Sequence, residues 1–266
     1  MKNIYNNILK IYDQEPLQGA VSHRGRKMMG FSDIQDFVTA AQKAAGGQEL
    51  KRVMSKAVRT LGFDYFSCLS LVDFVSPPPD AIGIVHYPEN WVSRYLDQRY
   101  FETDIILKKA LCVPTPFYWH KLDKLNKRQQ QIMDEAAQCG LKTGITVPIY
   151  VPGRLPTTFN VSGSCVDLPP NSHHALHLMA IYFQEAATRI FNKSDQDDRP
   201  GVPLTNRERE CLSWVAAGKS DNDIADILSI SSSTVHFHVE NAKRKHGVPT
   251  RVQAVIRAVI SGEIRP

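Results

Sequence analysis

The chain has 266 residues, of which 42% are hydrophobic and 22% charged, and its formal net charge is +5. This composition is typical of a globular protein with one large or two smaller domains, and the slight positive charge permits an anionic partner without requiring one. No run approaches the ~18 apolar residues of a membrane-spanning helix, and the N-terminus lacks the apolar core of a signal peptide. The cysteines show no zinc-type spacing, which is typical of free thiols in a reducing compartment: Cys68, Cys112, Cys139, Cys165 and Cys211. These features predict a cytoplasmic protein without a membrane partner or a bound cofactor.

Helices and strands are mixed over the first two thirds of the chain. Apolar residues at helical spacing predict helices over residues 31–42, 48–62, 88–101, 126–140 and 172–191. Within them we expect Ser32 to be an N-cap, Pro88 to stand at a first helical position, and Gly62 and Gly140 to end their helices. Runs of β-branched and aromatic residues predict strands over residues 63–74, 81–87, 142–151 and 157–166. Strand pairs with helices before and after them indicate an α-β-α sandwich on an antiparallel sheet.

The domain boundary is expected at residues 192–203, which are polar, charged and rich in proline and glycine, as linkers are. Beyond this segment the pattern is purely helical. The predicted parts are an N-terminal extension of unassigned role over residues 1–31, a first domain over 32–191, a linker over 192–203 and a second domain over 204–266. The predicted fold class is therefore α+β, an α-β-α sandwich followed by an all-α domain of four helices.

The second domain carries the clearest local signals. Thr205 with Glu208, and Thr250 with Gln253, form capping boxes, in which each side chain accepts the backbone N–H of the other residue. Helices are predicted over residues 204–217, 220–228, 233–246 and 251–261. Two helices joined by a tight turn at residues 229–231, inside a compact bundle, are typical of a helix-turn-helix.

The helix over residues 233–246 is the expected recognition helix. Hydroxyls and free amides at its N-terminus can hold phosphates, and His236 and Glu240, one turn apart, can reach base edges. The candidate DNA-binding residues are Lys219, Ser231, Ser232, Ser233, Thr234, His236, Glu240, Lys243 and Arg244. For any one of them the alternative stays open, namely that the hydroxyls only cap the helix and the basic residues only form a solvated last turn.

Residues 204–262 resemble the DNA-binding domain of the LuxR family of transcription regulators. The match runs without a gap, and the family's hallmark Glu, Leu and Gly fall on Glu208, Leu212 and Gly218. The resemblance implies a transcription regulator, not an enzyme, that binds double-stranded promoter DNA as a homodimer. It also implies that the last helix contributes to dimerisation.

An aromatic stripe marks the first domain. Tyr87, Trp91 and Tyr95 stand at positions i, i+4 and i+8, and Asp104 follows in the next segment. Indole and phenol donors beside a carboxylate suit a small, mostly apolar ligand with a few fixed polar groups. By itself, however, such a stripe is more typical of ordinary core than of a binding site.

The first domain is similar to the autoinducer-binding domain of the quorum-sensing members of the LuxR family, which bind N-acyl-homoserine lactones. Hallmark positions of that domain coincide with Trp91, Tyr95, Asp104, Trp119 and Gly144. The resemblance implies that Trp91 donates to the lactone carbonyl, Asp104 accepts from the ligand amide, Tyr87 donates to the amide carbonyl, and Tyr95 and Trp119 pack the ring. The candidate ligand-binding residues are Tyr87, Trp91, Tyr95, Asp104, Trp119, Asn160, Tyr65 and Ile84.

Two positions depart from the family pattern. Ile105 follows the hallmark Asp where Pro is usual, which loosens the local turn. Asn160 aligns with a position where a Ser or Thr often helps to bind the ligand amide, and the larger side chain would alter the preference for a 3-oxo or an unsubstituted chain.

Three other functions compete with this one. A phosphorylated response regulator could use Asp73, but the chain lacks the acidic pair and the late Lys of a receiver domain. A lactone-cleaving enzyme would need GxSxG or a metal cluster, and His173, His174 and His177 have no acidic partners nearby. A LuxR-type regulator that responds to a different small molecule, or acts without a ligand, remains the alternative.

Overall fold

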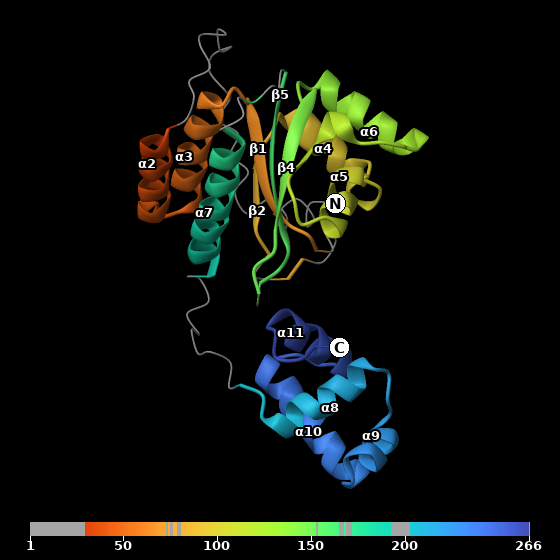
Figure 1. The fold of residues 1–266 in the computed structure, drawn as a ribbon. Coiled ribbons are helices and arrows are strands. Elements are labelled where there is room, and N and C mark those ends of the chain that lie inside the picture. Colours follow the sequence, from red (N-terminus) through yellow and green to blue (C-terminus); the bar gives the residue numbers. More distant parts are fainter. Residues whose placement is uncertain are drawn as a thin grey trace. The chain divides into compact units, whose positions relative to one another are not determined.

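The computed structural model describes residues 30–72, 74, 77–78, 81–152, 154–164, 168, 172–192 and 203–265. Nearly all of the predicted N-terminal extension and most of the predicted linker lie outside these residues. The chain divides into two compact units at residues 194 and 195, and each is described by itself (Figure 1).

The first unit is built on a five-stranded antiparallel sheet in the order β2-β1-β5-β4-β3. Its strands are β1 (Tyr65–Ser70), β2 (Gly83–His86), β3 (Phe117–Tyr118), β4 (Thr143–Ile149) and β5 (Thr157–Gly163). The four predicted strands are confirmed, and β4 and β5 pair as expected. The edge strand β3 was not predicted, because two residues are too few to show an alternating pattern.

Helices cover both faces of this sheet (Figure 1). One face carries α2 (Phe31–Lys43), α3 (Gly47–Thr60) and α7 (Ser172–Asn192), and the other carries α4 (Glu89–Asp97), α5 (Ile105–Cys112) and α6 (Lys127–Gln138). Short 3₁₀ turns, η1 (Tyr100–Glu102) and η2 (Trp119–Lys121), lead into α5 and out of β3. The predicted α-β-α sandwich is confirmed.

Two predicted helix starts are wrong by one or two residues. Gly30 is the N-cap of α2, where the Asp33 carboxylate accepts the Gly30 N–H, so Ser32 lies inside the helix. Pro88 is the N-cap of α4 and precedes its first helical position. Helix α5 was not predicted, and its N-cap is Asp104, whose carboxylate accepts the N–H of Ile106 at 2.7 Å.

The alternation of side chains along the strands separates two interiors. Phe66 and Cys68 of β1 enter the core between the sheet and α2, α3 and α7, together with Phe159 and Phe183. Ser67 and Leu69 point to the opposite face, toward α4, α5 and α6. Because this second face is less completely filled by apolar side chains, it holds the candidate site.

The second unit consists of four helices, α8 (Asn206–Ala216), α9 (Asp221–Leu228), α10 (Ser232–His246) and α11 (Arg251–Ile260). Both predicted capping boxes form, at Thr205 and at Thr250. Ser229, in the left-handed conformation with φ 53°, makes the sharp turn between α9 and α10. The predicted helix-turn-helix is thus present, and Glu208 ties it together by accepting the Lys245 Nζ–H at 2.6 Å.

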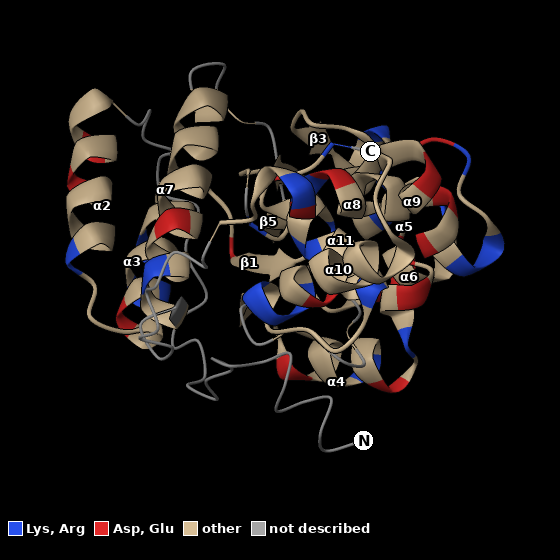
Figure 2. Ribbon diagram, turned by 90° about the horizontal axis from the view of Figure 1, so that it is seen from below, with Lys and Arg blue, Asp and Glu red and all other residues tan. Residues whose placement is uncertain are grey.

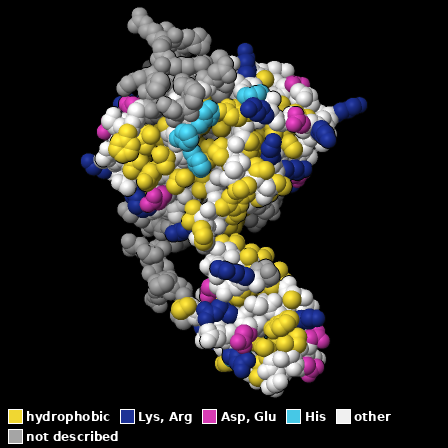
Figure 3. Space-filling model, viewed as in Figure 1, with side chains coloured by type: hydrophobic (Ala, Val, Ile, Leu, Met, Phe, Trp, Pro, Cys, Tyr) yellow, Lys and Arg dark blue, Asp and Glu magenta, His cyan; other side chains and the backbone are white. Residues whose placement is uncertain are grey.

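No helix in the described part of the chain is long and apolar enough to cross a membrane. The four described cysteines are free thiols. Figure 3 shows histidine side chains on the surface of the first unit. A ring nitrogen of His173 on α7 lies 2.7 Å from the Tyr118 hydroxyl. Within the described residues no three His, Cys, Asp or Glu side chains are grouped as metal ligands.

Candidate ligand pocket and nucleic-acid interface

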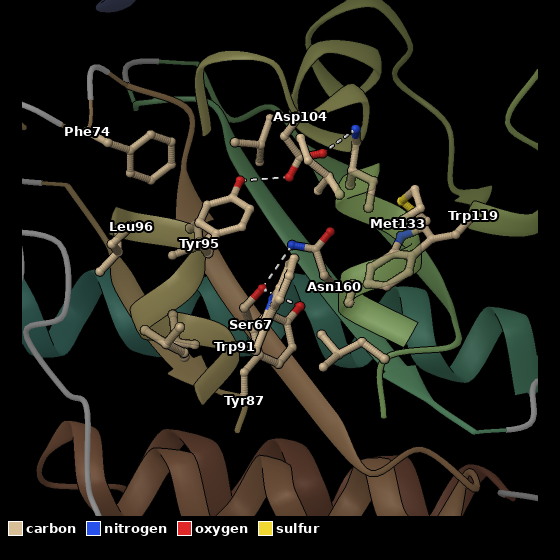
Figure 4. A pocket seen from close by; sticks show the side chains of 18 residues that line it. Ser67, Phe74, Tyr87, Trp91, Tyr95, Leu96, Asp104, Trp119, Met133 and Asn160 are labelled. Carbon is tan, nitrogen blue, oxygen red and sulfur yellow. Dashed lines mark hydrogen bonds between the residues drawn. The ribbon is translucent and has the colours of Figure 1, made fainter. Parts of the chain in front are cut away.

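A pocket lies between the sheet and helices α4, α5 and α6 (Figure 4). The cavity has a volume of about 80 Å³, where a single buried water needs about 10–15 Å³, so the pocket has room for a small molecule. Its walls come from β1, β2, β5, all three helices and the turns beside them: Ser67, Leu69, Phe74, Val85, Tyr87, Trp91, Val92, Tyr95, Leu96, Asp104, Ile106, Leu107, Trp119, Ile132, Met133, Ala136, Leu141 and Asn160.

The pocket joins two separate apolar clusters. One cluster contains Trp119, Ile132, Ala136 and Leu141, with Met133 packed against it. The other contains Phe74, Val85, Val92, Leu96 and Leu107, with Leu69 packed against it. Tyr87 and Tyr95 touch both clusters, so polar side chains stand at the waist between two apolar ends. Figure 4 shows this order, with Phe74 and Leu96 on one side, Trp119 and Met133 on the other, and Asp104 between them.

Asp104 is the buried acid of the waist. Its Oδ2 accepts the Tyr95 hydroxyl at 2.7 Å and its Oδ1 accepts the backbone N–H of Ile106 at 2.7 Å. Burial raises the pKa of the Asp104 carboxyl above its usual value, while these two hydrogen bonds act in the opposite direction. A carboxylate offers about four acceptor positions. Asp104 therefore retains capacity to accept an N–H or O–H from a ligand.

The phenols of the waist are donors. Burial raises the pKa of Tyr87 and of Tyr95 far above neutrality, and the nearby Asp104 carboxylate raises both further. Both hydroxyls therefore stay protonated at every physiological pH. Trp91 is 4% exposed and packs against Tyr95 and Tyr100, and its indole N–H has no hydrogen-bond partner among the described residues. Because a buried indole N–H usually has a hydrogen-bond partner, we expect a bound ligand to supply the acceptor for Trp91.

A chain of hydrogen bonds crosses the pocket floor. Trp119 Nε1–H donates to Thr146 Oγ1 at 2.9 Å, and Thr146 donates to Asn160 Oδ1 at 2.8 Å. Asn160 Nδ2–H donates to Ser67 Oγ at 3.0 Å, and Ser67 Oγ lies 3.0 Å from the Tyr87 hydroxyl. These residues belong, in order, to the turn after β3, to β4, β5 and β1, and to the turn after β2. The chain thus connects all five strands in their order across the sheet.

Trp119 is also fixed from behind by Gly144. A Cβ atom at Gly144 would lie 2.7 Å from the Trp119 ring and 2.6 Å from the backbone oxygen of Val161, closer than such atoms ever approach. The absence of a side chain at this position of β4 therefore lets the indole lie flat against the sheet. This is the structural reason for a glycine inside a buried strand.

Six of the eight residues predicted to bind ligand line the pocket: Tyr87, Trp91, Tyr95, Asp104, Trp119 and Asn160. The placement of Ile84 is wrong, because β2 alternates and turns Ile84 into the opposite core, while Val85 faces the pocket. Tyr65 does not line the cavity, and its ring instead packs against Tyr87 and Gly140.

Several lining residues were missed. The α6 side chains Ile132, Met133 and Ala136 carry no local signal that distinguishes a pocket wall from ordinary core. Ser67 could have been found, because it is a small polar residue on the same face of β1 as Leu69.

The second unit presents the face of α10 as a candidate DNA interface. Ser231 is the N-cap of α10, and its hydroxyl accepts the N–H of Thr234 and lies within 2.8 Å of the Ser233 and Thr234 hydroxyls. Part of the predicted phosphate-binding set therefore caps the helix. Ser232 is half-buried, and Lys219 and His236 are exposed. A ring nitrogen of His236 lies 3.5 Å from the Asp221 carboxylate.

The rest of this face carries both charge signs. Glu240 pairs with Lys243 at 2.6 Å, and Arg244 bonds Asn241 within the basic last turn of α10 (Figure 2). The sequence prediction missed Phe237, which is 59% exposed next to His236. A large apolar side chain exposed on a recognition helix suits contact with a thymine methyl group.

Both units match known protein families. Residues 47–187 match the family described as the autoinducer binding domain, and residues 202–258 match the bacterial regulatory proteins of the luxR family. The chain is 31% identical over 227 residues to the transcriptional activator AhyR of Aeromonas hydrophila, covering 83% of this chain and 87% of AhyR. It is 32% identical over 216 residues to the quorum-sensing regulator RhlR of Pseudomonas aeruginosa, covering 80% of this chain and 88% of RhlR.

A solved structure shows the same two-part architecture. Escherichia coli SdiA is similar with a TM-score of 0.63 and 26% identity, over 89% of this chain and 99% of SdiA. SdiA in complex with octanoyl-rac-glycerol is similar with a TM-score of 0.62, over 87% of this chain and 95% of that chain. Together with the two family matches, these relatives show that the chain belongs to the LuxR family of quorum-sensing transcription regulators.

Proposed function

We propose that the first unit binds an N-acyl-homoserine lactone and that the second unit, as part of a homodimer in the cytoplasm, binds promoter DNA. The observation that carries the ligand class is the waist of the pocket. An unpartnered indole donor, a phenol donor and a carboxylate acceptor converge there, between two apolar ends. An acyl-homoserine lactone offers two carbonyl acceptors and one amide donor between an apolar chain and a compact ring, which matches this set.

Each polar group has one role in this proposal. Trp91 donates to the lactone carbonyl, Tyr87 donates to the amide carbonyl, and Asp104 accepts the amide N–H. Trp119 packs against the ring, and Tyr95 holds Asp104 in place through its 2.7 Å hydrogen bond. Filling the cavity stabilises the folded unit by mass action, about 2.7 kcal/mol when the ligand is at 100 times its Kd.

A monoacylglycerol is the second candidate, because SdiA, similar in fold, has been solved with octanoyl-rac-glycerol. Its hydroxyls could also donate to Asp104, and its acyl chain would occupy the same apolar end. It lacks the amide N–H and the lactone carbonyl, so the two ligand classes differ in the contacts that they make at the waist.

The test is a ligand panel with a matched variant. The protein is expressed in a host that lacks acyl-homoserine lactones, and its thermal midpoint is measured with lactones of increasing chain length, with their ester analogues and with monoacylglycerols. We expect the amide to be bound more tightly than the ester, since only the amide donates to Asp104. Asp104→Asn, which keeps an N-cap for α5, should remove that preference and cost about 1–3 kcal/mol of binding.

The outcomes separate the candidates. Equal binding of amide and ester would contradict the assigned role of Asp104. A response to monoacylglycerols alone would replace the ligand class, and a well-folded protein that responds to no compound in the panel would overturn a lactone-controlled regulator. For the DNA part, the ligand-bound protein should protect a palindromic site with two half-sites, one for each recognition helix.

A further inference from the structure

The two apolar ends of the pocket differ in shape, which decides where an acyl chain would lie. This inference rests on the proposed function. At the Trp119 end the indole ring lies against the backbone of Gly144, in one buried cluster with Ile132 and Ala136. This end suits a compact ring. The Phe74 end is lined by branched aliphatic side chains, including Val85, Val92 and Leu96, which suit a flexible hydrocarbon chain. With the amide at Asp104, the chain must run toward Phe74.

Phe74 closes this end. Its side chain is buried, 8% exposed, and packs with Val85, Val92, Leu96 and Leu107. Its ring lies 5.4 Å from the ring of Phe101, which fixes it from the outside. In Figure 4 Phe74 stands at the extremity of the pocket farthest from Trp119 and Met133.

A second hollow lies directly behind Phe74, on the surface. It is lined by Leu71, Phe101 and Leu111 and edged by the charged residues Arg99, Glu102 and Lys108. Phe74 and Leu107 belong to the walls of both the pocket and this hollow. Among the described residues, only these two side chains are shared by the two spaces, so they stand between them.

We propose that Phe74 is the end wall that sets the longest acyl chain that the pocket accepts. A chain that reaches the ring can extend no further without displacing it. Removing the ring would join the pocket to the hollow, whose Leu71, Phe101 and Leu111 would then cover additional methylenes. Leu107, the other shared side chain, lies within helix α5 and forms the side of the opening rather than its end.

The test is the chain-length profile of ligand binding in the full-length protein. For the wild type, the affinity should rise about fourfold per added methylene while the chain has room and then fall for longer chains. For Phe74→Ala, the preferred length should increase by at least two carbons. Phe74→Leu, a milder change that retains an apolar side chain, should shift it in the same direction by a smaller amount. Met133→Ala, at the opposite end, should leave the preferred length unchanged.

Each outcome decides one point. An unchanged preferred length in both Phe74 variants would overturn the assignment of the end wall. A shift in Met133→Ala instead would show that the chain runs toward α6 and would overturn it equally. If Phe74→Ala does not fold, the Phe74→Leu profile decides. If the wild type binds no lactone of any length, the proposed function fails, and the end-wall inference fails with it.

Discussion

At the residue scale, the position of Trp119 depends on the absence of a side chain at Gly144. The indole is held by a hydrogen bond to Thr146 on one side and by the bare backbone of Gly144 on the other. Any side chain at position 144 would have to displace either the indole or the backbone oxygen of Val161. Since β4 is paired with β5 at Gly144 and with β3 at the next two residues, the indole would be the part that moves.

Gly144→Ala should therefore destabilise the first unit by about 1–3 kcal/mol, the usual cost of overfilling a packed interior. It should also lower ligand affinity, because a shifted indole intrudes on the pocket. Thermal unfolding and ligand titration measure the two effects. The matched control is Gly46→Ala, where no atom lies within 4 Å of the new Cβ, and we expect it to cost less than about 1 kcal/mol. Equal losses in the two variants would show that the contact with Trp119 is not the cause.

The polar residues of the pocket were predictable from the sequence, and most of its apolar walls were not. Trp91 and Tyr95 match hallmark positions of the family, and Tyr87 stands four residues before Trp91, so the resemblance picked them out where the aromatic stripe alone did not. Ile84 was assigned to the wrong face of the sheet, because neighbouring residues of a strand point to opposite faces. Which apolar side chains border a cavity is decided by distant packing, as with Met133 against Trp119, and no local pattern records it.

At the scale of elements, the helix-turn-helix depends on one buried carboxylate. Glu208 is 4% exposed, accepts the N–H of Thr205 and accepts a hydrogen bond from Lys245 of α10. Burial would raise the pKa of Glu208, but the hydrogen bonds from Lys245 and Thr205 outweigh it and hold the pKa below its usual value of 4.5. Glu208 therefore joins the start of α8 to the end of α10, and the helix cap is also a tertiary contact.

This contact should make the second unit sensitive to acid. A carboxyl whose pKa is lower when folded adds stability above its unfolded pKa, and that stability is lost as the pH falls through the folded value. Protection of α8 and α10 amides from hydrogen exchange should therefore weaken below about pH 4.5. Glu208→Gln should lose about 1–3 kcal/mol at neutral pH and show a flatter acid profile. Glu210→Gln, which removes an exposed ion pair with Arg207 on the same helix, should cost less than about 1 kcal/mol. An unchanged acid profile in Glu208→Gln would contradict the assignment.

The exposed ring of Phe237 leads to a prediction about base recognition. If it contacts a thymine methyl group, replacing that thymine by uracil should weaken binding of the wild type about fourfold, the value of one buried methyl group. Phe237→Ala should bind both sequences equally. The measurement is a binding assay on a selected operator substituted one thymine at a time. A wild-type protein indifferent to every such substitution would exclude this contact.

Elements with strong local rules were predicted best. Capping boxes and glycine stops placed α8, α10 and α11 correctly, because the signals lie within a few residues of each terminus. Helix α5 and strand β3 escaped prediction because both are short and owe their conformation to neighbours. Asp104 is the N-cap of α5 and also lines the pocket. Strand β3 is defined only by its pairing with Ile145 and Thr146 of β4.

At the scale of the whole molecule, the proposed homodimer requires an apolar surface, and α11 offers one. Val252, Ile256 and Val259 are 62%, 51% and 38% exposed and recur at i, i+4 and i+7, on one side of the helix. The opposite side, with Ala254 and Ala258, is buried in the bundle. A stripe of this kind on both protomers can pair with itself across a twofold axis.

Ile256→Glu should therefore weaken dimerisation without unfolding the bundle, because the side chain is already exposed. Sedimentation should show a monomer, and affinity for a palindromic operator should fall about 100-fold or more as the two half-sites are no longer bound together. Ile256→Val, which keeps the apolar surface, should behave like the wild type. A dimer that survives Ile256→Glu would place the interface elsewhere.

The bonded chain from Trp119 to Tyr87 has a direction. An indole N–H can only donate, so the Thr146 oxygen accepts from Trp119. The Thr146 hydroxyl then donates to Asn160 Oδ1, and the Asn160 Nδ2–H donates to Ser67. The Ser67 oxygen lies 3.0 Å from the Tyr87 oxygen, and either hydroxyl can donate between them. The row therefore has a fixed direction from Trp119 as far as Ser67, and it ends at Tyr87 on the pocket wall. When Ser67 donates to Tyr87, the Tyr87 proton is left for the cavity, and this wall then offers a donor to a carbonyl oxygen before any ligand binds.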